Sequence, residues 1–228
     1  MSNPIKPNLK TEWLPLLLIA ASALLAPYFY AHWPEQVVSH WNFAGQPDGY
    51  SSKAFSAFFF PLLIAGMYLL LIFLPYLDPQ KRRYGEFAGV YHIFKNLITA
   101  VFFIMFLAAG IYNLGYQINI GIITATIIGL MMIIMGNYMG KIKFNWFMGI
   151  RTPWTLSSET VWNKTHRVGG WLFMLFGLCL IISPYLPESL AIILFIGSAA
   201  LAVIGTFAYS YIIFRQEKIT GSDVSKKS

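Results

Sequence analysis

Charged residues are scarce in this chain: Asp, Glu, Lys and Arg make up only 11% of its 228 residues. Soluble domains carry about 25% charged residues, so this chain lacks the charge that solvates a globular surface. Acidic residues are especially few, with nine Asp and Glu against 16 Lys and Arg. Together with a mean hydropathy of +0.60, the low charge excludes an ordinary soluble domain.

Carboxylates are missing from the places where membrane pumps need them. All nine Asp and Glu lie between the long apolar runs or at their ends. Proton relays and ion-coupled transporters hold carboxylates inside their membrane spans instead. The sequence also has no HExxH or GxSxG motif, which would indicate a metalloprotease or a serine hydrolase. Ion-coupled pumps and hydrolases therefore lose most of their support.

Cysteine is almost absent as well. The single Cys179 lies inside an apolar run, so an intramolecular disulfide is excluded. His32, His40 and Asp48 share one polar loop, but their spacing of eight and eight residues matches no metal-binding motif. We expect no metal site and no cofactor.

Long apolar runs are what the chain does have. The charge-free runs are Trp13–Tyr30, Ala54–Leu77, Asn96–Gly140, Val168–Leu186 and Ser189–Phe214, and a helix of about 20 residues crosses a bilayer. Residues 96–140 would form a helix of about 67 Å, long enough to cross the bilayer twice. They contain a polar break at Asn113–Asn119. The sequence therefore predicts an all-α, polytopic membrane protein with a bundle of six transmembrane helices.

The distribution of basic residues predicts the orientation of the bundle. If the N-terminus is cytoplasmic, Lys53 is the only one of the 16 Lys and Arg that lies outside. Cytoplasmic loops carry such an excess of basic residues, so both termini are predicted to be cytoplasmic. The net charge of +7 then reflects topology and attraction to anionic membrane lipids, and we expect no direct contact with nucleic acid.

Two loops contain more specific side chains than a connector needs. In the outer loop, His32–Lys53, the spacing of Val37, Val38 and Trp41 suggests one face of a short interfacial helix. Gln46–Tyr50 (QPDGY) is typical of a turn, because Pro fixes φ and Gly tolerates positive φ.

The inner loop, Lys141–Arg167, is dense in Trp, Arg, Asn, Gly and Pro. Arg151–Trp154 is predicted to be extended or turned, because the residue before a proline avoids the helical region. Ser157 or Ser158 is expected to cap a helix with Glu159 in its first turn. That helix would continue through Trp162 and His166 into the fifth span.

The inner loop also holds the strongest candidates for a site. The Arg151 guanidinium can stack on a ring or bind a carboxylate or phosphate. His166 lies four residues after Trp162 on the same helix face, where it either contacts a ligand or bonds a backbone group. Gly136 and Gly140 form a GxxxG motif that favours close helix packing. These residues indicate either an organised site or a rigid structural knot, and the sequence does not separate the two.

The inner segment (GNYMGKIKFNWFMGIRTPWTLSSETVWNKTHRVGGWLF) closely resembles the signature of the SdpI family of bacterial membrane immunity proteins. The matching residues are Gly136, Asn137, Asn145, Gly149–Leu156, Trp162, Thr165, His166 and Gly170. The outer segment resembles a small domain of unknown function that often precedes this signature. Its matching residues are Pro34, His40–Asn42, Gly45, Pro47–Gly49 and Lys53.

The resemblance implies a multi-pass protein of the bacterial plasma membrane that protects its cell from a secreted, membrane-active peptide toxin. It also implies signalling through a small cytoplasmic transcriptional repressor, and no enzymatic activity. We expect two units: residues 1–95, with two spans and the outer loop, and residues 96–228, with four spans and the inner loop. The candidate residues for binding the toxin or a partner are His40, Trp41, Asn42, Asp48, Asn137, Asn145, Arg151, Thr152, Trp154, Trp162, Thr165 and His166.

One rival reading is an enzyme or carrier at the inner leaflet, for a lipid-like or phosphate-bearing ligand. His166 would act as the base and Arg151 would hold the phosphate. A cleft that joins these residues to Asn137 would favour this rival. A third reading is a structural or sensory membrane protein with no peptide ligand.

Overall fold

The chain folds into six long helices and one β-hairpin in a computed structural model that describes residues 4–43 and 45–225, with side chains as far as Ile219. The long helices are α1 (Leu9–His32), α2 (Lys53–Leu77), α3 (Ala88–Asn113), α4 (Ile120–Met139), α5 (Glu159–Ile182) and α6 (Glu188–Ser225). Two short 3-10 helices, η1 (Lys81–Glu86) and η2 (Ser183–Tyr185), precede α3 and α6.

All six helices are long and apolar enough to cross a membrane. Their outward faces carry large apolar side chains, including Leu24, Leu62, Phe73, Ile193 and Val203, each more than half exposed. In water such a surface would be costly, whereas lipid solvates it. The chain is therefore a predominantly helical, multi-pass membrane protein with six candidate spans, as the sequence predicts.

The helix ends confirm the predicted break between the third and fourth spans. α3 ends at Asn113, and Asn119 caps α4 by accepting the N–H of Ile122 at 3.0 Å. α3 begins at Ala88, earlier than the expected start at Asn96. Lys95 is therefore part of a helix and not of a loop. The expected division at residue 95 falls inside this helix, and the two-unit organisation stays a prediction.

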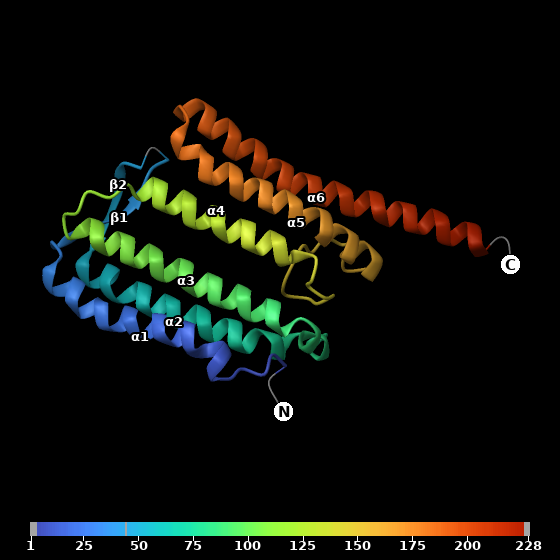
Figure 1. Cartoon of the computed structure of the whole chain (residues 1–228), viewed down its shortest axis with the longest axis horizontal. Helices are drawn as coiled ribbons and strands as arrows, with labels where there is room; N and C mark the ends of the chain where they lie inside the picture. The colour runs from blue at the N-terminus through green and yellow to red at the C-terminus, as the bar shows by residue number, and fades with distance from the viewer. Residues whose placement is uncertain (1–3, 44, 226–228) are drawn as a thin grey trace.

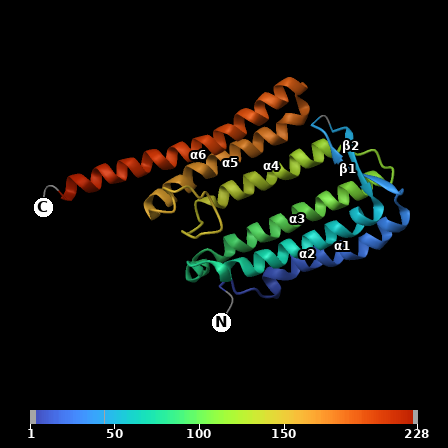
Figure 2. The ribbon, with the colours of Figure 1, turned by 180° about the vertical axis from the view of Figure 1, so that it is seen from behind.

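The helices form two groups of three (Figure 1). α1, α2 and α3 pack together, α4, α5 and α6 pack together, and α3 lies next to α4. The hairpin lies at one end of the bundle; both termini and the segment between α4 and α5 lie at the other, as the view from behind also shows (Figure 2). Which end faces the cytoplasm stays a prediction from the basic residues.

The outer loop is a β-hairpin, so the expectation of an interfacial helix is wrong. β1 (Gln36–Trp41) pairs antiparallel with β2 (Pro47–Ser52). Val37 is fully buried beneath the hairpin, where it packs with Phe29, Trp33 and Phe106. A β-branched residue that packs on one strand face favours a strand, and this anchoring defines which face of β1 meets the bundle.

The predicted turn is also displaced. The turn is closed by bonds among Asn42, Gly45 and Gln46: Asn42 N donates to Gln46 O and Gly45 N donates to Asn42 O, both at 2.9 Å. Gly45 takes a φ of +76°, which favours glycine. Pro47 is instead the first residue of β2, a strand position that tolerates the missing N–H.

Helices α4 and α5 meet through two pairs of glycines. A Cβ added to Gly136 would lie 2.5 Å from the Gly170 carbonyl oxygen, and one added to Gly129 would lie 2.6 Å from the Gly177 oxygen. Only glycine permits this approach, which gives the two backbones direct contact. The packing expectation for Gly136 is confirmed, whereas Gly140 is the C-terminal cap of α4.

Candidate functional site

A cavity of about 800 Å³ lies beneath the hairpin. Its walls come from the hairpin, from α2, α3 and α4, and from the end of α5, the start of α6 and the connection between them. Three of the predicted outer residues, His40, Trp41 and Asn42, line it, and Asp48 does not. A largely apolar cavity of this size with a few polar groups is typical of a ligand site.

The hairpin is held over this cavity by one side chain of α3. Asn113 Oδ1 accepts the N–H of Val38 at 2.8 Å, and Asn113 Nδ2 donates to the Val38 carbonyl at 2.9 Å. This two-way bond satisfies both backbone groups of one strand residue. The bond fixes the position of β1 relative to α3.

The polar candidates on the hairpin have different surroundings. His40 Nδ1 lies 2.5 Å from Asp48 Oδ1, and the two side chains are 71% and 43% exposed. The Trp41 ring packs edge-on against Tyr112, at 5.2 Å between centroids. Its buried Nε1 has no hydrogen-bond partner in the described part of the chain. His40 and Asp48 thus form a surface pair, whereas Trp41 presents an unused donor.

No metal site is formed by these residues. His32 lies apart from the pair and bonds the Tyr28 carbonyl oxygen of its own helix at 2.8 Å. Within residues 4–43 and 45–219, no three His, Cys, Asp or Glu side chains come together as metal ligands.

The inner loop is organised around Asn145, which is fully buried. Its Oδ1 accepts the N–H groups of Phe147 and Met148 at 2.9 and 2.6 Å, and its Nδ2 donates to the carbonyls of Lys143 and Met148. One amide side chain therefore replaces the regular backbone bonds that this irregular segment lacks.

Residues from the α2–α3 connection extend this network. Asp78 Oδ2 accepts the Tyr84 hydroxyl at 2.8 Å and the Trp146 N–H at 2.9 Å. Burial raises the pKa of Tyr84, and the hydrogen bond to Asp78 raises it further, so this phenol stays a donor. The contact joins the first three helices to the inner loop.

His166 connects the loop to α5. Its Nε2 accepts the N–H of Ile150 at 2.9 Å, and its Nδ1 donates to the Trp162 carbonyl at 2.8 Å. A backbone N–H can only donate, so the ring is neutral with its proton on Nδ1. The ring is fully buried and stacked on Trp162, at 4.0 Å between centroids. The Trp162 Nε1 in turn donates to Ile142 O at 2.9 Å.

Helix α6 is tied to the same loop. Thr152 is buried and its hydroxyl donates to Ser210 Oγ at 3.0 Å. Trp154 packs its ring against Phe207 and Tyr211. As predicted, Arg151–Trp154 is irregular, and Ser158 caps α5 by accepting the Val161 N–H at 3.3 Å.

The remaining inner candidates do not join this cluster in the same way. Arg151 is exposed and donates from Nη1 to the Trp146 carbonyl at 2.9 Å. Asn137 is exposed on α4. Thr165 is fully buried on α5, and its hydroxyl has no partner among the described residues. Neither the cavity beneath the hairpin nor a smaller one of about 210 Å³, between α2, α3 and the inner loop, is lined by His166, Arg151 or Asn137.

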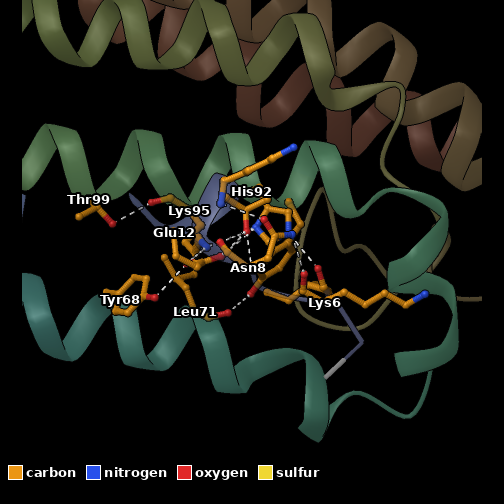
Figure 3. A network of polar contacts seen from close by, with 12 residues as sticks. Lys6, Asn8, Glu12, Tyr68, Leu71, His92, Lys95 and Thr99 are labelled. Atoms are coloured by element: carbon orange, nitrogen blue, oxygen red, sulfur yellow. Dashed lines mark hydrogen bonds and ion pairs between the residues drawn. The ribbon is translucent and has the colours of Figure 1, made fainter. Parts of the chain in front are cut away.

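A buried ionic cluster was not predicted from the sequence (Figure 3). Glu12 of α1 forms an ion pair with the fully buried Lys95 of α3 and accepts the Tyr68 hydroxyl of α2 at 2.9 Å. His92 lies beside both, with Nδ1 3.3 Å from Lys95 Nζ, and its Nε2 donates to Ile5 O at 2.9 Å. The sequence contains a signal for this cluster, because both charges lie next to apolar runs, but the position of Lys95 fits a loop cation equally well.

Comparison with known proteins agrees with the sequence motifs. Residues 141–210 match the SdpI/YfhL protein family, and residues 17–65 match a domain of unknown function, DUF1648. The chain is 26% identical to the protein named "Immunity protein SdpI" from Bacillus subtilis (strain 168) over 214 residues, which cover 94% of this chain and all of the relative. No solved structure gives a significant match. The hairpin lies within the DUF1648 match and the inner loop within the SdpI/YfhL match, so this multi-pass bacterial membrane protein is similar to the SdpI/YfhL family in both of its structured loops.

Proposed function

We propose that this protein is a membrane immunity protein that protects a bacterial cell from a secreted, membrane-active peptide toxin. The observation that carries the proposal is the similarity to an immunity protein over 94% of this chain and all of the relative. A match of that extent supports a shared role for the whole molecule and not for one domain only.

The toxin would meet the hairpin end of the bundle. The excess of Lys and Arg at the opposite end favours an extracellular hairpin, and a secreted peptide reaches the membrane from that side. The hairpin offers an exposed His40–Asp48 pair and the mouth of a large cavity lined by Trp41 and Asn42. These groups would provide polar recognition at the surface and apolar burial below it.

The inner loop would hold the bundle together and present a rigid face to a cytoplasmic transcriptional repressor. Asn145, Thr152, Thr165, Trp162 and His166 are buried and serve the fold. Trp146 and Arg151 are exposed on the loop, with the Trp146 ring 48% exposed. Trp and Arg are the residue types that most often dominate protein interfaces, which supports this surface as the docking face.

The enzyme or carrier alternative has less support. His166 uses both ring nitrogens within the protein, so it has no lone pair with which to accept a substrate proton. Arg151 lies on the surface of the loop with its guanidinium on a backbone carbonyl. An immunity and signalling role requires neither a base nor a phosphate site here.

Survival of a toxin-sensitive bacterial host tests the proposal. Cells that express the chain would be challenged with a panel of purified membrane-active peptides, alongside cells with an empty vector. We expect the chain to raise the lethal concentration of at least one peptide. Asp48→Ala should lower this protection by removing the carboxylate partner of His40, at equal membrane abundance.

Arg151→Ala tests the proposed repressor-docking surface of the inner loop separately from toxin recognition at the hairpin. We expect this variant to keep the fold but lose the response of a repressor-controlled reporter gene. If wild-type cells die at the same concentration as vector cells with every peptide, the immunity proposal is wrong. If Asp48→Ala and Arg151→Ala both behave as wild type, immunity stands and the roles given to the two loops are wrong.

A further inference from the structure

The hairpin cavity differs in charge from the whole chain, which has a net charge of +7. Among the described residues its lining contains no Lys and no Arg, and Glu188, the first residue of α6, supplies its one carboxylate. Glu188 has no ion pair among the described residues, and it is exposed. The cavity therefore combines an apolar interior with a negative charge at its edge.

Most of the other polar groups in the lining are occupied by the protein itself. Asn113 holds the hairpin through Val38, and Asn119 caps α4. Ser56 bonds Ser51 at 2.5 Å, and the Ser183 hydroxyl donates to the Leu180 carbonyl at the end of α5 at 2.9 Å. These groups stabilise the walls and are not free to bind a ligand.

One charged group of the lining is open to a ligand. Glu188 is exposed and has no ion pair among the described residues, so its carboxylate can bind a positive charge. The Trp41 Nε1 is buried without a partner among the described residues, and it has no surface open to the cavity. The negative charge of the Glu188 carboxylate would attract an ammonium group of a ligand.

We propose that this cavity binds an apolar segment of a peptide that carries a positive charge, a lysine or a free amine, close to that segment. The apolar side chains of the peptide fill the cavity, and its cation lies against Glu188. The inference rests on the proposed function, since it assigns the toxin-binding site and the chemistry of the toxin.

A phospholipid fits the same cavity less well. Its phosphate needs cationic or N–H donors, and the lining supplies no Lys or Arg. The nearby cation of the hairpin end, Lys53, is already paired with Glu35 at 2.7 Å. The charge pattern therefore favours a cationic peptide over an anionic lipid headgroup.

Photocrosslinking of synthetic peptides to the full chain in phosphatidylcholine nanodiscs tests the proposal. The probes are three acetylated peptides of about a dozen residues, made of leucine and alanine with one benzoylphenylalanine. They differ at a single position next to the apolar segment, which is lysine, glutamine or glutamate. Crosslinking yield against peptide concentration gives the affinity, and mass spectrometry of the crosslinked fragments gives the site.

Two substitutions in the cavity have matched controls. Ala125→Phe fills the cavity from α4, and Ala23→Phe adds the same ring to an exposed position of α1. Glu188→Gln removes the carboxylate of the cavity, and Glu35→Gln removes a carboxylate of the hairpin end that does not line it. Membrane abundance and thermal stability are measured for all four variants.

We expect the lysine peptide to bind more tightly than the glutamine and glutamate peptides and to crosslink to the cavity walls. Glu188→Gln should weaken the lysine peptide about five-fold, the size expected of a partly exposed ion pair, and leave the glutamine peptide unchanged. Ala125→Phe should weaken all three peptides about ten-fold or more, because the added ring occupies their volume. The two control variants should bind as wild type.

Equal binding of the three peptides, or crosslinks outside the cavity, would overturn the proposal. So would a phospholipid that copurifies with wild type and is lost from Ala125→Phe, since the occupant would then be a lipid. The survival assay separates the two claims. If Ala125→Phe and Glu188→Gln cells remain protected, the immunity function stands and this binding site is wrong. If the cavity binds the lysine peptide but the chain never protects cells, the binding site stands and the immunity function is wrong.

Discussion

His166 accepts the backbone N–H of Ile150 at 2.9 Å, and this bond fixes the inner loop against α5. The imidazole is fully buried, stacked on Trp162 and bonded at its second nitrogen to the Trp162 carbonyl. Every hydrogen-bonding atom of the side chain is therefore used in the fold. His166 therefore holds the inner loop to α5 as part of the fold.

His166→Ala should destabilise the protein by about 2–4 kcal/mol, because it leaves a cavity and an unpaired backbone donor. Heating the detergent-purified protein and measuring the fraction that remains monodisperse would show this loss. His40→Ala, which removes a ring that is 71% exposed, should change stability by less than about 0.5 kcal/mol. Equal losses from the two variants would contradict a structural role for His166.

Gly149→Ala should disrupt the same joint from the other side. A Cβ at this position would lie 2.2 Å from His166 Nε2, and the residue has a φ of +115°. Gly115→Ala provides the control, because Gly115 also has a positive φ, +94°, but open space around it. We expect Gly149→Ala to lower the apparent Tm well beyond Gly115→Ala. Similar shifts would mean that backbone strain, and not contact with His166, determines the cost.

Gly136→Ala should separate α4 from α5. The new methyl group would meet the Gly170 carbonyl oxygen at 2.5 Å, and a backbone atom cannot move aside as a side chain does. Gly197→Ala on α6 meets nothing within 4 Å and should be neutral or stabilising by up to about 1 kcal/mol through helix propensity. Thermal unfolding in detergent compares the two, and a neutral Gly136→Ala would refute backbone-to-backbone packing.

The Glu12–Lys95 pair should behave as one unit. Glu12→Gln or Lys95→Met alone leaves a buried charge without its partner, which typically costs about 3–5 kcal/mol. The double variant removes both charges and should lose less stability than the sum of the single changes. A double-mutant cycle of thermal stabilities measures this coupling, and additive losses would show that the two charges do not depend on each other.

The six spans were predictable because span length and hydropathy are local properties of the sequence. The cap at Ser158 was predictable for the same reason, since its partner Val161 lies three residues away. The hairpin was missed because the spacing of Val37, Val38 and Trp41 fits a helix face as well as a strand. The choice between them depends on pairing with Pro47–Ser52 and on burial of Val37 against other helices.

The interior of the inner loop could not be predicted, because its partners come from distant segments. Asp78 bonds Trp146, and Ser210 bonds Thr152, across separations that no short pattern reveals. The burial of Lys95 could not be predicted for a related reason. A charge at the edge of an apolar run is typical of a loop residue, and only tertiary packing brings the Glu12 carboxylate next to Lys95.

The account depends on the hairpin facing the outside of the cell. Cysteine accessibility in intact cells measures this orientation. In a Cys179→Ser background, Tyr50→Cys places a thiol on the hairpin and Trp146→Cys places one on the inner loop, at side chains that are 62% and 48% exposed. The account predicts that a membrane-impermeant maleimide labels Tyr50→Cys in intact cells and Trp146→Cys only after lysis. The reverse pattern would place the cavity and the His40–Asp48 pair in the cytoplasm, out of reach of a secreted peptide, and would contradict the account.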